Sequence, residues 1–539
     1  MTSTRAIAAL RHPWTPVVAI TVAFVVLAVI EVARGRFVHD EGLLTYHFAK
    51  LAWLEPRAAL FLQKSRPPIS LLYAPAAALG WHAFALLHVL VAAAALPCIA
   101  AIAARLGHGR PAIATLVLAA SPLFAAAAVA GVSNSDGVAL ACVATWLLVC
   151  TRRGALAGAL LAALPWVRAE LAPLSALLLV ASGTRHGGRA WLGAIAFVVV
   201  YALLGALEHR DVLWLVHYPP ALTEPMADNP YWAHHDGRVD AASIGATLLA
   251  LTPAWMLAIP LRRGRIAREQ WLWWSFAAFE LGVLLALPRW RVFNFDLSPR
   301  YLLGVLPALA LALSSNLQAW PEPPRVATRV VETLALAGAL ALGWAAAMAG
   351  QPLGGLVATA VAATALATAR AGFVRVGIAI VTLLVIVGPL GFADGARLRR
   401  DHESPEIAEL LARLREDPRL AGRPLYTNAP LLSATLAGRH GEVHYIVQAD
   451  QLHELVALTN PDNGQRQRLL AAIARDFYGT PVFPDALAPE LLPSDAVLLL
   501  VDDPRLSLVM PAAIWDDALV TLSASGRVRV AELRPRGAP

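Results

Sequence analysis

Charged side chains are scarce in this sequence. Only 15% of its 539 residues are charged, whereas a typical soluble domain has about 25%. Apolar stretches of about 20 residues, the length that a helix needs to cross a membrane, recur along most of the chain. The scarcity of charge therefore excludes an ordinary soluble protein and predicts an α-helical polytopic membrane protein.

The positive charge of the chain does not indicate a nucleic-acid partner. The formal net charge is +7, but the basic residues lie in short clusters between the apolar stretches. That arrangement is typical of the cytoplasmic loops of membrane proteins, which are enriched in lysine and arginine. We therefore expect membrane lipids, and no nucleic acid, among the partners of this protein.

Cysteines and phosphate-binding glycine motifs are also rare or absent. The three cysteines, Cys98, Cys142 and Cys150, all lie inside apolar stretches. This placement excludes a disulfide framework and a cysteine metal site. No glycine-rich phosphate loop opens a helix of the C-terminal region, so we expect no nucleotide site there. The sequence requires no cofactor, although a divalent cation is compatible with it.

The apolar stretches predict about 13 membrane spans. They cover residues 13–33, 83–104, 111–130, 137–151, 154–167, 169–184, 190–207, 241–261, 270–287, 301–318, 328–348, 354–370 and 373–392. The first stretch lacks a small-residue cleavage site, so we expect a retained span and not a removed signal peptide. Arginine clusters precede the first span and follow even numbers of spans, which places those loops in the cytoplasm.

The remaining loops then face the outside of the membrane. They are residues 34–82, 131–136, 208–240 and 288–300, and the chain from about residue 393 lies on the same side. The bias towards Ala, Leu, Arg and Gly is typical of a GC-rich bacterial genome. We therefore expect the bacterial inner (plasma) membrane, with the outer loops and the C-terminal region in the periplasm.

Two domains follow from this division. Residues 1–392 form a transmembrane domain, in which 34–82 is an outer loop with juxtamembrane helices and 208–240 is an outer substrate loop. Residues 393–539 are richer in charge and form a small soluble α/β domain. Strands are predicted there at 424–428, 443–447 and 495–502, and helices at 404–416 and 429–437.

An acidic pair, Asp40-Glu41, directly follows the first span. Carboxylates at the mouth of a membrane helix are costly to bury, so they indicate a functional site. A carboxylate beside an apolar surface has a raised pKa and can serve as a general base. The alternative is a helix cap with a solvated charge, in which Asp40 caps a helix over 41–54 whose apolar stripe lies at the membrane interface.

Three further groups of charged residues lie at the same membrane face. Asp136 lies in the short outer turn before the fourth span, where it is either a site residue or an N-cap. Arg168 and Glu170 interrupt two apolar stretches, and Arg168 is either a cation for a phosphate or part of an internal ion pair. Arg289, Arg291 and Arg300 lie on the outside, which suggests an anionic partner or local pairing with Asp296 and lipid headgroups.

The outer loop 208–240 is another candidate region. Its polar residues include His217, Tyr218 and Glu224, and we expect it to be a mobile substrate loop. His234, His235 and Asp236 are weak candidates for a divalent cation, because histidine and carboxylate bind such ions but the spacing matches no strong metal motif.

These motifs together resemble the GT-C superfamily of membrane glycosyltransferases, in the branch of the lipid A aminoarabinose transferases and protein O-mannosyltransferases. The matching stretches lie mostly within residues 1–320. They are His39–Tyr46, Arg66–Leu72, Ala104–Gly107, Ser121–Phe124, Ser135–Leu140, Val167–Glu170 and Ser298–Leu303. Val167–Glu170 is similar to an Arg-Pro-Glu stretch of the family, with Ala169 in place of the proline.

The resemblance implies an inverting transfer of a sugar from a polyprenyl-phosphate donor to a lipid, glycan or protein acceptor on the periplasmic side. It implies that Asp40 is the base, that Glu41 supports it, and that Asp136 orients the acceptor or contacts a metal. Residues implied for the donor phosphate are Arg168 and Arg300, with Lys64 or Arg66 in place of a lysine of the first loop. Arg291 is a further candidate for the phosphate, because it is an arginine on the outer side of the membrane.

Two other functions remain open from the sequence. A transporter or flippase for a lipid-linked glycan has internal repeats and ionisable groups within its spans, whereas the charges of this chain gather at one membrane face. A non-catalytic cell-envelope assembly protein would use the outer domain for docking. A degenerate, inactive relative of the glycosyltransferases is also compatible with the motifs.

Overall fold

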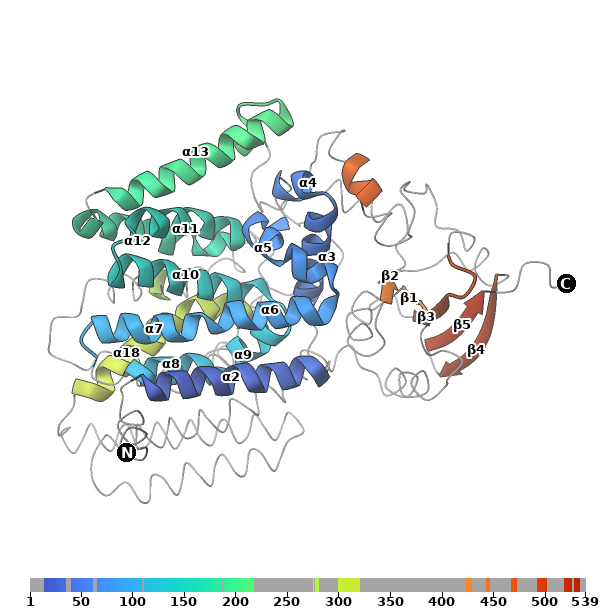
Figure 1. Ribbon diagram of the computed structural model, residues 1–539, viewed down its shortest axis with the longest axis horizontal. Helices are drawn as coiled ribbons and strands as arrows, with labels where there is room; N and C mark the ends of the chain where they lie inside the picture. The colour runs from blue at the N-terminus through green and yellow to red at the C-terminus, as the bar shows by residue number, and fades with distance from the viewer. Residues whose placement is uncertain are drawn as a thin grey trace, which may run out of the picture.

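The computed structural model consists mostly of helices, with one sheet near the C-terminus (Figure 1). It describes residues 14–34, 40–61, 65–108, 111–186, 188–217, 275, 277–280, 299–319, 423–428, 443–445, 467–472, 492–501, 518–525 and 528–533. The predicted spans at 241–261, 328–348, 354–370 and 373–392 lie outside these residues, as do the predicted helices at 404–416 and 429–437.

The labelled helices lie between Thr15 and Ala319. They are α2 (Thr15–Arg34), α3 (Asp40–Leu54), α4 (Pro56–Phe61), α5 (Pro67–Ala78), α6 (Trp81–Ala93), α7 (Ala95–Arg105), α8 (Pro111–Ala119), α9 (Pro122–Val129), α10 (Ser133–Cys150), α11 (Gly154–Val167), α12 (Ala172–His186), α13 (Arg189–His209), α14 (Trp214–His217) and α18 (Leu306–Ala319). Two short 3-10 helices, η2 (Ala169–Leu171) and η4 (Pro299–Val305), precede α12 and α18.

Four of the described helical stretches are long and apolar enough to cross a membrane. They are Thr15–Ala33, Trp81–Arg105, Ser133–Cys150 and Arg189–His209. A fifth span is possible where Pro111–Ala119 and Leu123–Val129 meet at a bend of 64°. These five agree with predicted spans, whereas 154–167, 169–184 and 301–318 correspond to shorter apolar helices, so the count of 13 stays a prediction.

Small side chains fill much of the interior of the helical bundle. Residues 124–130 are buried, and five of these seven residues are alanine. Small residues let helix backbones approach closely, which is how membrane helices pack in the absence of a hydrophobic driving force between them. Larger buried side chains such as Tyr73, Phe84 and Phe124 complete the core.

Helices α3, α4 and α5 occupy the predicted outer loop 34–82 and lie between the bundle and the sheet (Figure 1). One face of α3, with Tyr46 and Ala49, packs into the core of the bundle. The predicted apolar stripe of this helix does not serve only as a lipid-facing surface, because Phe48 and Leu51 pack against Leu469 and Ala472 of a helical turn at 467–472. Periodicity finds such a stripe but does not specify what covers it.

A buried glutamate links the same turn to α4 and α13. Glu208, at the end of α13, forms ion pairs with Arg57 of α4 and with Arg468 of the 467–472 turn. The C-terminal region is thereby connected to α4 and α13 by charge and to α3 by apolar contacts. We expect these contacts to fix the position of the C-terminal half of α3.

The sheet has five strands in the order β2-β1-β3-β5-β4. The strands are β1 (Leu425–Thr427), β2 (Val443–Tyr445), β3 (Val497–Val501), β4 (Leu519–Ser525) and β5 (Val528–Leu533). β1 pairs in parallel with β2 and β3, and β5 pairs antiparallel with β3 and β4. The three predicted strands are therefore present, whereas the α/β character of the whole 393–539 domain stays a prediction.

Candidate active site

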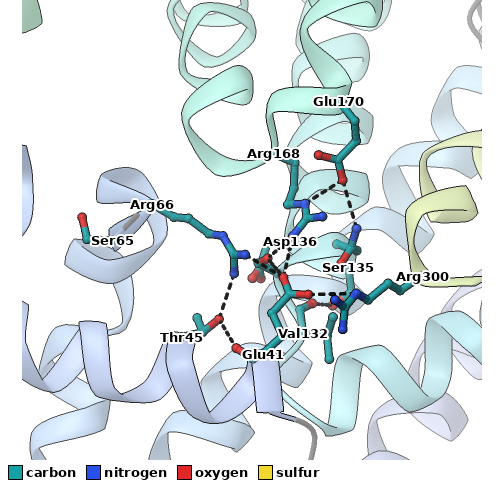
Figure 2. Close-up of polar contacts among 12 residues, drawn as sticks. Glu41, Thr45, Ser65, Arg66, Val132, Ser135, Asp136, Arg168, Glu170 and Arg300 are labelled. Atoms are coloured by element: carbon teal, nitrogen blue, oxygen red, sulfur yellow. Dashed lines mark hydrogen bonds and ion pairs between the residues drawn. The ribbon is translucent and has the colours of Figure 1, made fainter. Parts of the chain in front are cut away.

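Three arginines converge on one buried glutamate at the end of the bundle (Figure 2). Oε1 of Glu41 lies 2.9 Å from Nη2 of Arg66 and also accepts a hydrogen bond from Nη1 of Arg168. Its Oε2 lies 3.2 Å from Nε of Arg300. The side chain of Glu41 is only 6% exposed, so these charges replace water around it. We call these four residues the arginine cluster.

Each member of the arginine cluster lies at or beside a helix terminus. Glu41 is in the first turn of α3, Arg66 immediately precedes α5, Arg168 connects α11 to η2, and Arg300 is in η4. Arg66 has a φ of 52°, in the left-handed region that residues other than glycine rarely adopt. Such strained backbone gathers at functional sites, where the surrounding structure enforces it.

Gly42 determines how closely α3 approaches the bundle. A Cβ atom at this position would lie 1.7 Å from the carbonyl oxygen of Ala130, which is an impossible contact. Glycine therefore lets the first turn of α3 lie directly against the connection between α9 and α10. That approach brings Glu41 to Ser133, whose Oγ donates a hydrogen bond of 2.6 Å to Oε1 of Glu41.

A second carboxylate completes the electrostatic environment of Arg168. Nε of Arg168 donates to Oε1 of Glu170 at 2.7 Å, and Nδ2 of Asn134 donates to the same oxygen at 3.1 Å. The internal ion pair predicted for this stretch is therefore present. Three guanidiniums face two carboxylates in this group, which leaves one positive charge in excess and favours an anionic ligand.

The ring of Tyr301 contacts two guanidiniums of the arginine cluster. The Cζ atoms of Arg168 and Arg300 lie 5.2 Å and 5.3 Å from its centroid. Attraction between a cation and the face of an aromatic ring stabilises this arrangement. Tyr301 therefore holds the two like charges near one another without neutralising either of them.

The pKa of Glu41 lies well below its usual range. Burial raises this pKa, but the positive charges of Arg168, Arg66 and Arg300, together with the Ser133 hydrogen bond, lower it by more. Glu41 is therefore ionised at every pH near neutrality. A carboxylate held in this state does not take a proton readily, which suits Glu41 to the role of a counter-charge for the three arginines.

Asp136 does not cap helix α10, so the N-cap interpretation of this residue is wrong. The N-cap of α10 is Val132, so Asp136 lies inside the first turn and does not cap the helix. Its Oδ1 accepts a hydrogen bond from the hydroxyl of Tyr73, and its Oδ2 lies 3.1 Å from Nε2 of His88. His88 in turn contacts the carbonyl oxygen of Ala128 through Nδ1 at 2.7 Å. We infer that Asp136 positions the first turn of α10, which carries Ser133 and Asn134.

Asp40 is the first residue of α3, next to Glu41, but its side chain lies outside the described part of the structure. His217 is exposed at the end of α14, and its Nδ1 lies 2.6 Å from Oδ2 of Asp211. The other predicted site residues lie outside the described residues. They are Lys64, Arg291, Tyr218, Glu224, His234, His235 and Asp236.

No metal site emerges from the part of the chain that the structure describes. Within those residues, no group of three or more His, Cys, Asp or Glu side chains is placed to hold an ion. The three weak metal candidates of the 208–240 loop lie beyond those residues, so a divalent cation stays an untested possibility.

Sequence reasoning missed three residues of this region. Thr45 accepts a hydrogen bond of 3.3 Å from Nη1 of Arg66, and its position four residues after Glu41 on a helix is a signal that could have identified it. Tyr301 directly follows Arg300, within the stretch that resembles the family. Glu280 is buried in an apolar stretch, where an ionisable residue is by itself an indication of function.

Comparison with known proteins identifies the fold. No protein-family model and no curated protein matches the chain by sequence. Two solved structures of ArnT from Cupriavidus metallidurans match it instead. The one bound to undecaprenyl phosphate has a TM-score of 0.57 and 14% identity, over 96% of this chain and 98% of that chain.

The second structure, in the apo state, has a TM-score of 0.54 and 13% identity, over 95% of this chain and 97% of that chain. At these identities the likeness concerns the fold and not the substrate. The match extends over nearly the whole length of both chains, so it covers the helical bundle as well as the C-terminal region. The chain therefore shares the fold of these two ArnT structures.

Proposed function

We propose that the protein is a membrane glycosyltransferase that moves a sugar from a polyprenyl-phosphate donor to an acceptor at the periplasmic face. The observation that supports this most is the arginine cluster, in which three guanidiniums from separate elements surround one carboxylate. A cluster with excess positive charge at the ends of membrane helices suits a phosphate attached to a lipid.

The arginines differ in their exposure, and the difference suggests their roles. The side chain of Arg168 is 7% exposed, whereas those of Arg66 and Arg300 are 21% and 23% exposed. We propose that the two more accessible guanidiniums receive the donor phosphate first. Arg168 then supplies a fixed positive charge behind them. The ArnT structure bound to undecaprenyl phosphate supports this choice of lipid, because it has the same fold.

The transfer step requires a base and a stabilised leaving group. The acceptor hydroxyl oxygen forms a bond to C1 of the sugar while the bond between C1 and the phosphate oxygen breaks. Asp40 takes the hydroxyl proton, and the electron pair of the broken bond stays on the phosphate. Attack from the opposite face inverts the configuration at C1. Fixed guanidiniums stabilise the charge that develops on the leaving polyprenyl phosphate.

Glu41 has a separate role in this proposal. It neutralises part of the charge of the arginine cluster and holds the guanidiniums in place. Neighbouring residues on a helix point about 100° apart, so Asp40 and Glu41 need not share a direction. We propose that Asp40 faces the acceptor while Glu41 faces the arginines.

The experiment that tests this function measures cleavage of the bond between the sugar and the lipid phosphate. The full-length protein, purified in lipid nanodiscs, receives undecaprenyl phosphate linked to mannose, aminoarabinose or galacturonic acid, with a bacterial lipid and glycan extract as acceptor. We expect acceptor-dependent release of undecaprenyl phosphate and a glycosylated product of inverted anomeric configuration, read by mass spectrometry and NMR.

Two results would contradict the proposal and separate it from the alternatives. Movement of the sugar-linked lipid across a vesicle membrane with the glycosidic bond intact would indicate a transporter. Binding of none of the donor lipids, together with stable association with envelope proteins, would indicate an assembly protein.

A further inference from the structure

Glu280 is a buried carboxyl group outside the arginine cluster. It belongs to the apolar stretch 270–287 and is only 2% exposed. Its Oε1 atom has no hydrogen-bond partner among the residues that the structure describes. Burying a polar atom without a partner is unfavourable, so Oε1 of Glu280 does not stabilise the fold.

The surroundings of Glu280 connect it to the candidate active site. Glu280 lies within electrostatic range of Glu170 and Arg168. Arg168 is already engaged by Glu170 and Glu41. The described partners of this site therefore leave Oε1 of Glu280 without a hydrogen bond, and an ionisable residue buried in this way is a candidate for ligand binding.

The chemistry of the donor indicates which ligand fits. A sugar is bonded directly to the phosphate that carries it, so a group near a phosphate-binding guanidinium lies within reach of the sugar. The two oxygens of a carboxyl group accept hydrogen bonds from hydroxyl groups. A site built to hydrogen-bond a substrate hydroxyl discriminates strongly against analogues that lack it.

We propose that Glu280 binds hydroxyl groups of the transferred sugar and thereby contributes to the choice of donor. This inference rests on the proposed function, because it requires that the arginine cluster holds the donor phosphate. It assigns the sugar to the side of Arg168 on which Glu280 lies. Glu280 is a binding residue here and takes no part in proton transfer.

The test compares two lipids that differ only in the sugar. Dissociation constants are measured by native mass spectrometry for undecaprenyl phosphate and for the undecaprenyl-phosphate sugar that the wild type transfers. Glu280→Leu removes the hydrogen-bonding group, and Glu280→Gln retains part of it. Glu31→Gln is the matched control, because Glu31 is also buried in an apolar helix but belongs to α2.

We expect Glu280→Leu to weaken binding of the sugar-linked lipid about tenfold, which corresponds to one lost hydrogen bond of about 1.4 kcal/mol. Glu280→Gln weakens binding of the sugar-linked lipid less than Glu280→Leu does. For both variants, binding of undecaprenyl phosphate stays within about twofold of the wild type. The thermal unfolding midpoint (Tm) is unchanged or higher, because an uncompensated buried group is removed.

Three outcomes overturn the inference. Equal weakening for both lipids would assign Glu280 to the phosphate or to the structure, and unchanged binding of both would exclude it from the site. A lowered Tm without any change in lipid preference would make Glu280 a structural residue. These three results leave the proposed function intact, whereas a wild type that binds neither lipid overturns both.

Discussion

Replacing Asp40 by asparagine is expected to lower the rate of sugar transfer by about a hundredfold or more, because general base catalysis typically contributes that much. Asparagine has nearly the shape of aspartate but cannot take the proton of the acceptor hydroxyl. The arginine cluster is untouched, so binding of undecaprenyl phosphate stays unchanged. The measurement is the initial rate of undecaprenyl phosphate release, with lipid binding measured on the same preparation.

Asp136→Asn is the comparison that separates a base from a positioning residue. Asp136 accepts a hydrogen bond from Tyr73 and lies against His88, so its replacement lowers Tm as well as the rate. Asp40→Asn lowers the rate without lowering Tm. Unchanged turnover in Asp40→Asn would remove Asp40 from the role of base, and a parallel loss of Tm would make it structural.

Replacing Arg168 by alanine is expected to have the largest combined effect. The guanidinium contacts Glu41 and Glu170 together, and removing one partner of a buried ion pair costs about 3–5 kcal/mol. The loss of a fixed charge at the leaving group lowers the rate by about a hundredfold to a thousandfold. Tm and the initial rate of transfer are measured together for this variant.

Arg168→Lys keeps the charge but not the geometry. One ammonium group cannot reproduce the two separate directions in which Nε and Nη1 of arginine donate. We expect this variant to recover part of the Tm and little of the rate. Full recovery of the rate in Arg168→Lys would show that the guanidinium geometry is irrelevant to transfer.

The double variant Arg168→Ala/Glu41→Gln isolates the ion pair between these residues. Because Arg168→Ala and Glu41→Gln each remove the same ion pair, the double variant is expected to lose less stability than the sum of the single variants. The pKa of Glu41 is lowered in the folded protein, so its stabilising contribution is present above the ordinary glutamate range and is lost as the pH falls below it. If the double variant lost as much stability as the two single variants together, Arg168 and Glu41 would not be directly coupled.

The sequence predicted which charged residues lie at the same membrane face better than it predicted the role of each residue. Helix ends at the same membrane face are readable from apolar lengths and arginine clusters, so Glu41, Arg168 and Arg300 could be grouped from the sequence. Arg66 was a candidate only as a substitute for a lysine of the family. The pairing of three arginines with one carboxylate could not be predicted. It depends on the close approach of α3 at Gly42, which no periodicity encodes.

Asp136 illustrates the limit of reasoning from local sequence. Its position before an apolar stretch fits an N-cap, but its partners at positions 73 and 88 come from two other helices. The apolar stripe of α3 shows the same limit. Its sequence predicts the stripe, but the residues that cover it lie about 420 positions later in the chain. Contacts between distant segments follow from the fold as a whole, which one sequence does not specify at the level of side chains.

The most direct test of this account is the position of the lipid phosphate in the full-length protein with undecaprenyl phosphate bound, determined by electron cryo-microscopy. We predict that the phosphate lies within hydrogen-bonding distance of the guanidiniums of Arg66 and Arg300, with Arg168 behind them, and that Glu41 moves away from at least one of these arginines. A phosphate bound elsewhere, with all the ion pairs of Glu41 intact, would contradict the central claim.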